Sequence, residues 1–180
     1  MALDATPLLG ARTGIGVFTS GALAALSRRG DLDLRGYGLS WTGRRQLAAA
    51  LPPGVRVCPR PMAAAPLLEL WRRFDGPVAE WWTGRVDVIH GTNYVVPPTR
   101  RAAQVVSVYD LTPIRFPELC TPTSLTYPAL VARALGRGAM VHTLTAAVAA
   151  EVVDAFGVEP ARVRVVAPGV DPVDHLGRPA

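Results

Sequence analysis

The stretch AMVHTLTAAVAAEVVDAFGVEPARVRVV, residues 139–166, decides the fold class. It opens with a short apolar run at 139–144, which predicts a strand. Thr145 is suited to cap a helix, and Gly157 is placed to end that helix. A second apolar run at 163–166 predicts another strand. Because a strand, a helix and a strand follow one another, the stretch predicts a βαβ unit within a parallel sheet.

The same alternation of short apolar runs and helical patterns continues towards the N-terminus. Strands are predicted at residues 3–4, 32–39, 55–58, 86–90 and 105–109, and helices at 16–29, 46–51 and 124–137. In the helix at 16–29 we expect Val17, Leu23 and Leu26 to face the core. We therefore expect an α/β fold over residues 1–168, a Rossmann-like parallel sheet flanked by helices. Residues 169–180 are polar and rich in Pro and Gly, as at the start of a linker.

A stripe of apolar residues marks the middle of the chain. Its members recur at spacings of three or four residues, which predicts one helical face made of Leu67, Trp71, Phe74, Val78 and Trp81. We expect Gly76-Pro77 to divide this segment into two helices. The favoured interpretation is that the stripe packs on the sheet while neighbouring arginines face water. The alternative is peripheral contact with the inner face of a membrane, because interfacial helices also combine aromatic residues with Arg.

Composition bounds the class of protein. The 180 residues suffice for one α/β domain, and 49% of them are hydrophobic. No apolar run approaches the ~20 residues that a membrane span requires. The first four residues carry no basic segment, so we expect no signal peptide and a cytoplasmic protein. Cys58 and Cys120 lack the spacing of a metal or redox site, and we expect neither a metal nor a cofactor.

The charge of the chain indicates attraction to phosphate groups. The net charge is +5, and all 19 basic residues are Arg. The phosphates can belong to a nucleotide, an anionic lipid or a nucleic acid, and composition alone does not choose among them. Because the sequence has no RNA-binding aromatic motif, zinc finger or long basic run, we expect no nucleic-acid partner.

The loops that follow the predicted strands form the candidate site, since ligands of open parallel sheets bind at the carboxyl ends of strands. The first such loop reads GARTGIG, residues 10–16. Its glycines would let the backbone approach a bulky anion at the N-terminus of the next helix. The spacing is not that of a dinucleotide fingerprint, and a purely structural turn is an equally good interpretation.

Two further loops carry polar side chains. His90, Thr92 and Asn93 lie at the end of one predicted strand. A lone His at a strand end is more often structural, but its polar neighbours favour a functional loop. Asp110 leaves the next strand, where it can orient a sugar hydroxyl, act as a base or cap the following turn.

Four segments, in order along the chain, resemble the opening half of family-four GT-B glycosyltransferases. They are Asp4-Ala5-Thr6-Pro7-Leu8 with residues 12–19, Asp87-Val88-Ile89-His90 with Asn93 and Pro97, Val108-Tyr109-Asp110-Leu111 with Arg115-Phe116-Pro117-Glu118, and residues 145–158 leading to 163–171. The resemblance implies two Rossmann-like domains that face a cleft, with this chain as the N-terminal, acceptor-side domain. A C-terminal donor-binding domain, in cis or in trans, would begin just past Asp171.

The resemblance also implies the chemistry. A hexose would pass from a nucleotide-sugar donor to a glycan, lipid or small-molecule acceptor, with retention at the anomeric carbon and without a metal. The donor diphosphate would lie against Gly14, Ile15 and Gly16. The acceptor would contact His90, Thr92, Asn93 and Arg115.

Catalysis would fall to Tyr109 and Asp110. The family often has His at the position of Tyr109, where it contacts the donor sugar. A tyrosine can donate a hydrogen bond, but it does not serve as a base at neutral pH in the way His does. This departure from the family pattern leaves the role of Tyr109 open.

The sequence leaves three interpretations of the chain. The first is half of a transferase, expected to be inactive alone because the family's donor-binding Arg/Lys pair and its paired glutamates lie in the other domain. The second is a stand-alone Rossmann-like binding module, or one subunit of a split glycosyltransferase. The third is another GT-B relative such as a sugar-nucleotide epimerase, which the Tyr109-Asp110-Leu111 pattern disfavours.

Overall fold

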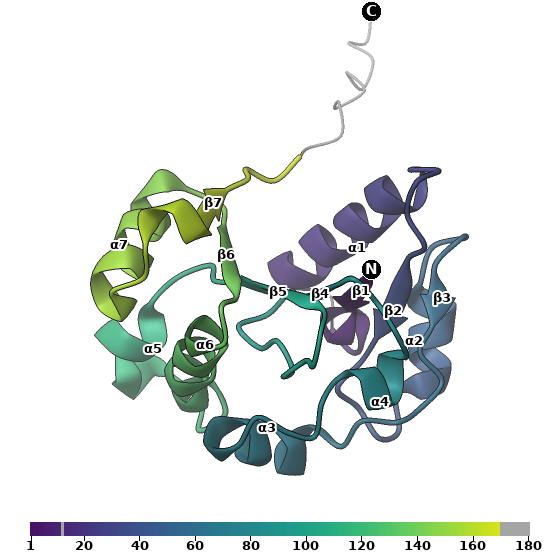
Figure 1. The fold of residues 1–180 in the computed structure, drawn as a ribbon, viewed down its shortest axis with the longest axis horizontal. Helices are drawn as coiled ribbons and strands as arrows, with labels where there is room; N and C mark the ends of the chain where they lie inside the picture. The colour runs from purple at the N-terminus through teal and green to yellow at the C-terminus, as the bar shows by residue number, and fades with distance from the viewer. Residues whose placement is uncertain (12, 170–180) are drawn as a thin grey trace, which may run out of the picture.

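Seven parallel strands form one sheet in the order β3-β2-β1-β4-β5-β6-β7 in the computed structural model, which describes residues 1–11 and 13–169. The strands are β1 (Ala2–Asp4), β2 (Arg35–Tyr37), β3 (Arg56–Val57), β4 (Val88–Gly91), β5 (Ala103–Ser107), β6 (Met140–Thr143) and β7 (Val163–Val165). From β1 the chain moves one way across the sheet to β3, and from β4 it moves the other way to β7 (Figure 1). The predicted α/β, Rossmann-like fold is confirmed.

Helices connect the strands. The α-helices are α1 (Gly14–Ser27), α2 (Arg44–Ala50), α3 (Ala64–Arg73), α4 (Glu80–Thr83), α5 (Thr112–Arg115), α6 (Tyr127–Gly136) and α7 (Ala146–Phe156). Single turns of 3-10 helix lie at η1 (Thr6–Leu8), η2 (Pro117–Leu119), η3 (Ser124–Thr126) and η4 (Pro160–Arg162). Elements of one turn show no periodicity, so α5 and the 3-10 turns could not be predicted from the sequence.

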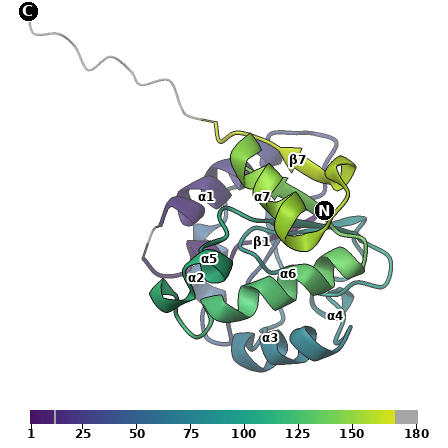
Figure 2. The same cartoon turned by 90° about the vertical axis from the view of Figure 1, so that its left-hand side faces the viewer.

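The core has two parts, one on each face of the sheet. On one face, Leu3 of β1 packs with Leu23 of α1 and Leu47 of α2. On the other face, Ile89 of β4 belongs to a larger cluster that includes Trp71 of α3. Figure 1 shows α1 on one side of the sheet and α3, α4 and α6 on the other. Seen from the β7 end, α7, α6 and α3 follow one another down the side of the molecule (Figure 2).

Helix α1 meets the sheet through small side chains. Gly16, Thr19 and Leu23 are its buried residues, and they share one helical face. Val17 is 58% exposed, so the prediction that it faces the core was wrong. The helix begins at Gly14 rather than Gly16, and Val17 lies six residues before the buried Leu23, a spacing that puts the two side chains on different faces of the helix.

The apolar stripe is divided at Gly76-Pro77, as predicted, but it does not form one buried face. Trp71 is buried, whereas Phe74 is 60% and Trp81 55% exposed. The reason is that the backbone becomes extended at Phe74, with φ of −132° and ψ of 158°, so the helical phase is lost before α4 begins. The prediction of a shared face was therefore wrong for these two aromatic residues.

The strand–helix–strand unit at residues 139–166 forms as expected. The hydroxyl of Thr145 accepts a hydrogen bond from the N–H of Val148 at 3.2 Å and caps α7. Gly157 ends the helix in the left-handed conformation, with φ of 60°. Of the predicted tail at 169–180, residues 170–180 lie outside the described residues. Among the residues that the structure describes, no helix is long and apolar enough to cross a membrane.

Candidate functional site

The carboxyl ends of β1 and β4 lie next to each other where the strand order reverses. In open parallel sheets this is the place where a crevice for a ligand forms. Thr92, just after β4, joins the two strands, because its hydroxyl donates a hydrogen bond to the carbonyl oxygen of Asp4 at 2.7 Å. The loops predicted to follow β1 and β4 therefore meet at one edge of the sheet.

The loop after β4 folds back on its own strand. A Cβ atom on Gly91 would lie 1.8 Å from the carbonyl oxygen of Val95, so only glycine fits there. Tyr94 adopts a φ of 57°, and its N–H donates to the carbonyl oxygen of Ser107 at 3.0 Å. These contacts fix the path of residues 92–95 across the edge of the sheet.

The two polar residues at the start of this loop, Thr92 and Asn93, lie in different environments. Thr92 is fully buried, and its hydroxyl is already engaged by Asp4. Asn93 is half-buried, and its side chain makes no hydrogen bond with any residue in the described part of the chain. Asn93 is therefore the residue of this loop that can receive a ligand, whereas Thr92 holds the loop in place.

The first turn of α1 holds the three residues predicted to meet a diphosphate. The hydroxyl of Thr13 caps the helix by accepting from the N–H of Gly16 at 3.4 Å. Gly14 is exposed, and a Cβ atom built on it would meet nothing within 4 Å. Ile15 is half-buried and Gly16 buried. The N–H groups at the start of a helix point outwards and carry partial positive charge, so this turn can receive an anion.

A chain of three polar side chains lies beneath α1. His90 Nε2 is 2.9 Å from Ser107 Oγ, which is 2.8 Å from His142 Nδ1. His142 Nε2 in turn lies 3.3 Å from the carbonyl oxygen of Val166. Burial lowers the pKa of His90 to about 4, helped by the neighbouring His142, and burial also lowers the pKa of His142. Both imidazoles are therefore neutral at pH 7.

The direction of the hydrogen bonds among His90, Ser107 and His142 follows from the group at one end of the series. The carbonyl oxygen of Val166 can only accept, so His142 donates from Nε2 and accepts at Nδ1. The hydroxyl of Ser107 therefore donates to His142, and its oxygen accepts from His90 Nε2. These hydrogen bonds join β4, β5 and β6 through side chains.

Tyr109 lies between the loop after β4 and helix α1. Its hydroxyl donates to the carbonyl oxygen of Thr92 at 2.6 Å. Phe18 of α1 meets the Tyr109 ring edge-on, with centroids 6.0 Å apart, and stacks on His142 at 5.4 Å. Burial raises the pKa of Tyr109 to about 12, so the phenol stays protonated.

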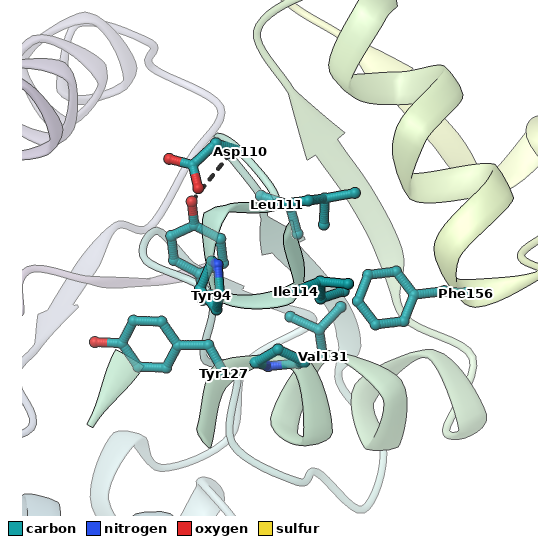
Figure 3. A pocket seen from close by; sticks show the side chains of 10 residues that line it. Tyr94, Asp110, Leu111, Ile114, Tyr127, Val131 and Phe156 are labelled. Atoms are coloured by element: carbon teal, nitrogen blue, oxygen red, sulfur yellow. Dashed lines mark hydrogen bonds between the residues drawn. The ribbon is translucent and has the colours of Figure 1, made fainter. Parts of the chain in front are cut away.

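Asp110 ends the loop after β5 with an exposed carboxylate. Its Oδ1 accepts from the N–H of Thr112 at 2.9 Å, and its own N–H donates to the Tyr94 hydroxyl at 3.0 Å. Figure 3 shows the Asp110 carboxylate beside the Tyr94 hydroxyl, on the opposite side from the apolar Val131 and Phe156. The void among these side chains measures about 10 Å³, which is room for about one water and none for a sugar. Asp110 can therefore meet a ligand only on its outer side.

Asp4, at the end of β1, is a buried acid. Its Oδ1 accepts from the N–H of Thr6 at 2.8 Å and from the Thr6 hydroxyl. Burial raises the pKa of Asp4 to about 6, although the bonds from Thr6 oppose the shift. The Thr6 hydroxyl also accepts from the N–H of Leu39 at 2.8 Å, which ties the end of β1 to the loop after β2.

Comparison with known protein families agrees with this arrangement. The model of Glycosyltransferase Family 4 matches residues 13–174, which include α1, both polar loops and the strand–helix–strand unit at the end of the sheet. The chain belongs to Glycosyltransferase Family 4. No curated protein sequence matches it.

Within this family-4 domain, Arg115 is engaged by an acid of another helix. It ends α5, and its guanidinium forms an ion pair with Glu151 of α7 at 3.0 Å. Its side chain is 55% exposed, so the pair leaves part of the guanidinium open to solvent. The structure therefore places Gly14, Asn93 and Asp110 after the carboxyl ends of β1, β4 and β5, while it ties Arg115 to a neighbouring helix.

Sequence reasoning missed three polar residues of the family-4 domain, namely Asp4, Ser107 and His142. A signal for two of them was present, because Ser107 and His142 are polar residues within predicted strands that are mostly apolar. Polar side chains in such strands need partners when they are buried. Across residues 1–11 and 13–169, no group of three or more His, Cys, Asp and Glu side chains is placed to hold a metal ion.

Proposed function

We propose that the chain is the acceptor-side domain of a GT-B glycosyltransferase that transfers a hexose, with retention, from a nucleotide-sugar to a glycan, lipid or small-molecule acceptor. The family match carries the proposal, supported by the meeting of the loops that follow β1 and β4 at one edge of the sheet. The chemistry we propose is metal-free and uses the nucleotide-sugar as a substrate rather than a cofactor. We place the reaction in the cytoplasm.

The donor diphosphate would lie against the first turn of α1, at Gly14, Ile15 and Gly16. The open space at the Cβ position of Gly14 lets a bulky anion approach the backbone closely. The N–H groups and the helix dipole would stabilise the negative charge of the leaving nucleoside diphosphate.

The acceptor would lie across the loops after β4 and β5. Asn93 has a half-buried amide available for a sugar hydroxyl. Asp110 has one oxygen held by Thr112, which leaves the other to accept a proton or a hydrogen bond from the attacking hydroxyl. His90, Thr92 and Tyr109 would act on the acceptor through the position of this loop, because their polar atoms are bonded within the protein. Arg115 would contact only a large acceptor that reaches α5.

The remaining donor contacts would come from a second domain, in cis or in trans. One helix N-terminus supplies only part of the stabilisation that a departing diphosphate requires. We therefore expect residues 1–180 alone to turn over no nucleotide-sugar at a useful rate. Robust transfer by the isolated chain would contradict this part of the proposal.

A pair of glycine variants tests the proposed donor contact. Gly14 and Gly21 both lie in α1, and a Cβ atom at either would meet nothing within 4 Å. Gly14→Ala places a methyl group where the diphosphate would lie, and we expect the donor KM to rise about tenfold, a loss near 1.4 kcal/mol. Gly21→Ala lies about two turns further along the same helix, so it serves as the matched control and should leave the donor KM unchanged.

The assay uses the protein with its donor-binding domain present. Both alanine variants should fold normally, since replacing Gly in a helix adds about 0.5–1 kcal/mol of stability. An unchanged donor KM in Gly14→Ala would contradict the donor contact. Nuclear magnetic resonance of the first product tests retention, and an inverted anomeric carbon would contradict the proposed stereochemistry.

A further inference from the structure

We propose that one face of this domain docks on an anionic lipid bilayer. The face comprises the end of α3, helix α4 and the loop before β5. We call it the arginine–aromatic face and define it by Leu70, Phe74, Trp81, Arg85, Arg100 and Arg101. It lies outside the proposed acceptor and donor contacts and does not depend on the proposed transferase activity.

The apolar part of the face is a cluster of exposed side chains. Phe74 is 60% exposed, Trp81 55% and Leu70 40%. Together with Pro77 and Val78 they line an open groove of about 690 Å³. Single exposed apolar residues are ordinary, but large side chains gathered around one groove mark a surface that meets an apolar partner.

The scaffold under the cluster is held by two other tryptophans. Trp71 is buried and donates from Nε1 to the carbonyl oxygen of Pro77 at 2.8 Å. Trp82 donates from Nε1 to the carbonyl oxygen of Pro61 at 3.0 Å. These bonds fix the segment between α3 and α4, so Phe74 and Trp81 project from a defined backbone.

The charged part of the face adjoins the groove. Arg100 borders the groove and also lines a second open pocket, with Arg85 and Arg101. Two acids, Glu80 and the exposed Asp87, lie in that pocket with these three arginines. Glu80 Oε1 accepts from the backbone N–H groups of Arg100 and Arg101, at 2.8 and 3.2 Å. Across the described residues, the guanidinium groups of Arg85, Arg100 and Arg101 form no ion pair with an acid.

Two other acids near the groove, Asp75 and Glu69, each pair with two arginines. Asp75, which lines the groove, pairs with Arg133 at 2.7 Å and with Arg137 at 3.2 Å. On α3, Glu69 pairs with both Arg72 and Arg73. Positive charge therefore exceeds negative charge around the exposed aromatic rings.

A bilayer with anionic headgroups matches both parts of the face. Tryptophan and phenylalanine enter the boundary between headgroups and acyl chains, while arginines beside them meet lipid phosphates. Arg85 and Arg100 precede β4 and β5, whereas the candidate site lies at the carboxyl ends of those strands. A bilayer on this face would therefore leave the crevice open to a ligand.

Vesicle cosedimentation of the full-length protein tests the proposal. We expect binding at low salt to phosphatidylcholine vesicles that contain phosphatidylglycerol, and little binding to phosphatidylcholine alone. Binding should weaken as salt is raised, because exposed charges are screened. Emission from Trp81 should shift to the blue on binding, and the shift should be lost in Trp81→Phe.

Two double variants separate the parts of the face. Phe74→Ala with Trp81→Ala removes the apolar part, and Arg100→Gln with Arg101→Gln removes two charges. We expect each to lower the partition coefficient about tenfold or more, since each arginine near an anionic surface contributes roughly fivefold. One matched control is Trp41→Ala with Phe116→Ala, at residues that are 68% and 51% exposed elsewhere. The other is Arg28→Gln with Arg45→Gln, at exposed residues directly after α1 and on α2. Both controls should bind like the unaltered protein.

Three outcomes would overturn the proposal. The first is no binding to the anionic vesicles at low salt. The second is equal loss of binding in the face variants and their matched controls, which would show that only net charge or general apolarity matters. The third is self-association in sedimentation velocity that disappears in Phe74→Ala with Trp81→Ala, which would assign the face to a second copy of the chain.

Discussion

Ser107 is the residue on which the buried polar chain depends. It is fully buried and lies between two neutral imidazoles, donating to one and accepting from the other. Ser107→Ala would leave a donor on His90 and an acceptor on His142 without partners. Each unsatisfied buried group costs about 1–3 kcal/mol, so for two groups we expect the free energy of unfolding to fall by roughly 2–6 kcal/mol. Urea unfolding measures the loss.

A matched control for this variant lies on α1. The hydroxyl of Ser27 donates to the carbonyl oxygen of Ala24 at 3.0 Å at the end of the helix, where water can replace it. Ser27→Ala should therefore change the free energy of unfolding by about 0.5 kcal/mol or less. Equal stabilities of the two alanine variants would show that the His90–Ser107–His142 chain contributes nothing.

Tyr109 is the residue whose role the resemblance left open. Its hydroxyl donates to the carbonyl oxygen of Thr92, so we expect it to act as a positioning residue for the loop that carries Asn93. Tyr109→Phe should lower the free energy of unfolding by about 1 kcal/mol and raise the acceptor KM, with little change in kcat. A fall in kcat of about a hundredfold at unchanged acceptor KM would instead support direct participation in the reaction.

At the scale of elements, the sequence predicted helices best where their ends carry strong signals. Thr145 and Gly157 define both ends of α7, and both act as predicted. Between α3 and α4 the ends carry no side-chain cap, and periodicity alone placed Phe74 and Trp81 in the core. Periodicity describes a continuous helix, so it loses its meaning once the backbone leaves the helix at Phe74.

The two threonine caps offer an element-scale prediction. Thr145 caps α7 with a bond of 3.2 Å, whereas Thr13 caps α1 with a longer bond of 3.4 Å. We expect Thr145→Ala to lower the free energy of unfolding by about 1 kcal/mol, and Thr13→Ala by less. Thermal unfolding of the two variants measures the difference. A larger loss in Thr13→Ala would show that the bond lengths do not rank the caps.

At the scale of the whole molecule, the parallel sheet could be predicted from the sequence, but the order of its strands could not. The alternation of strands and helices fixes the fold class, while the order depends on contacts between residues far apart in the chain, such as Leu3 with His90. The candidate site shows the same limit. Asn93 and Asp110 were found because they follow strands, whereas the partners of His90 lie on two other strands.

The pH dependence of stability combines groups from across the sheet. Burial lowers the pKa of His90 to about 4 and also lowers that of His142, so between about pH 4 and 6.5 the unfolded chain binds more protons at these sites. Both histidines therefore make the protein more stable as the pH rises towards 7. Asp4 acts in the opposite direction, because burial raises its pKa to about 6 and the folded chain then holds the extra proton between about pH 4 and 6.

Asp4→Asn isolates these opposing contributions. The variant removes the carboxyl group that lowers the free energy of unfolding as the pH rises. The amide oxygen of the new side chain can still accept a hydrogen bond from Thr6. Since one pKa unit corresponds to about 1.4 kcal/mol, we expect the gain in unfolding free energy from pH 5 to pH 7 to be about 1 kcal/mol larger in Asp4→Asn than in the unaltered protein. Urea unfolding at the two pH values measures both gains. An equal gain in Asp4→Asn would mean that the Asp4 carboxyl is already ionised at pH 5, because the hydrogen bonds from Thr6 then offset the effect of burial on its pKa.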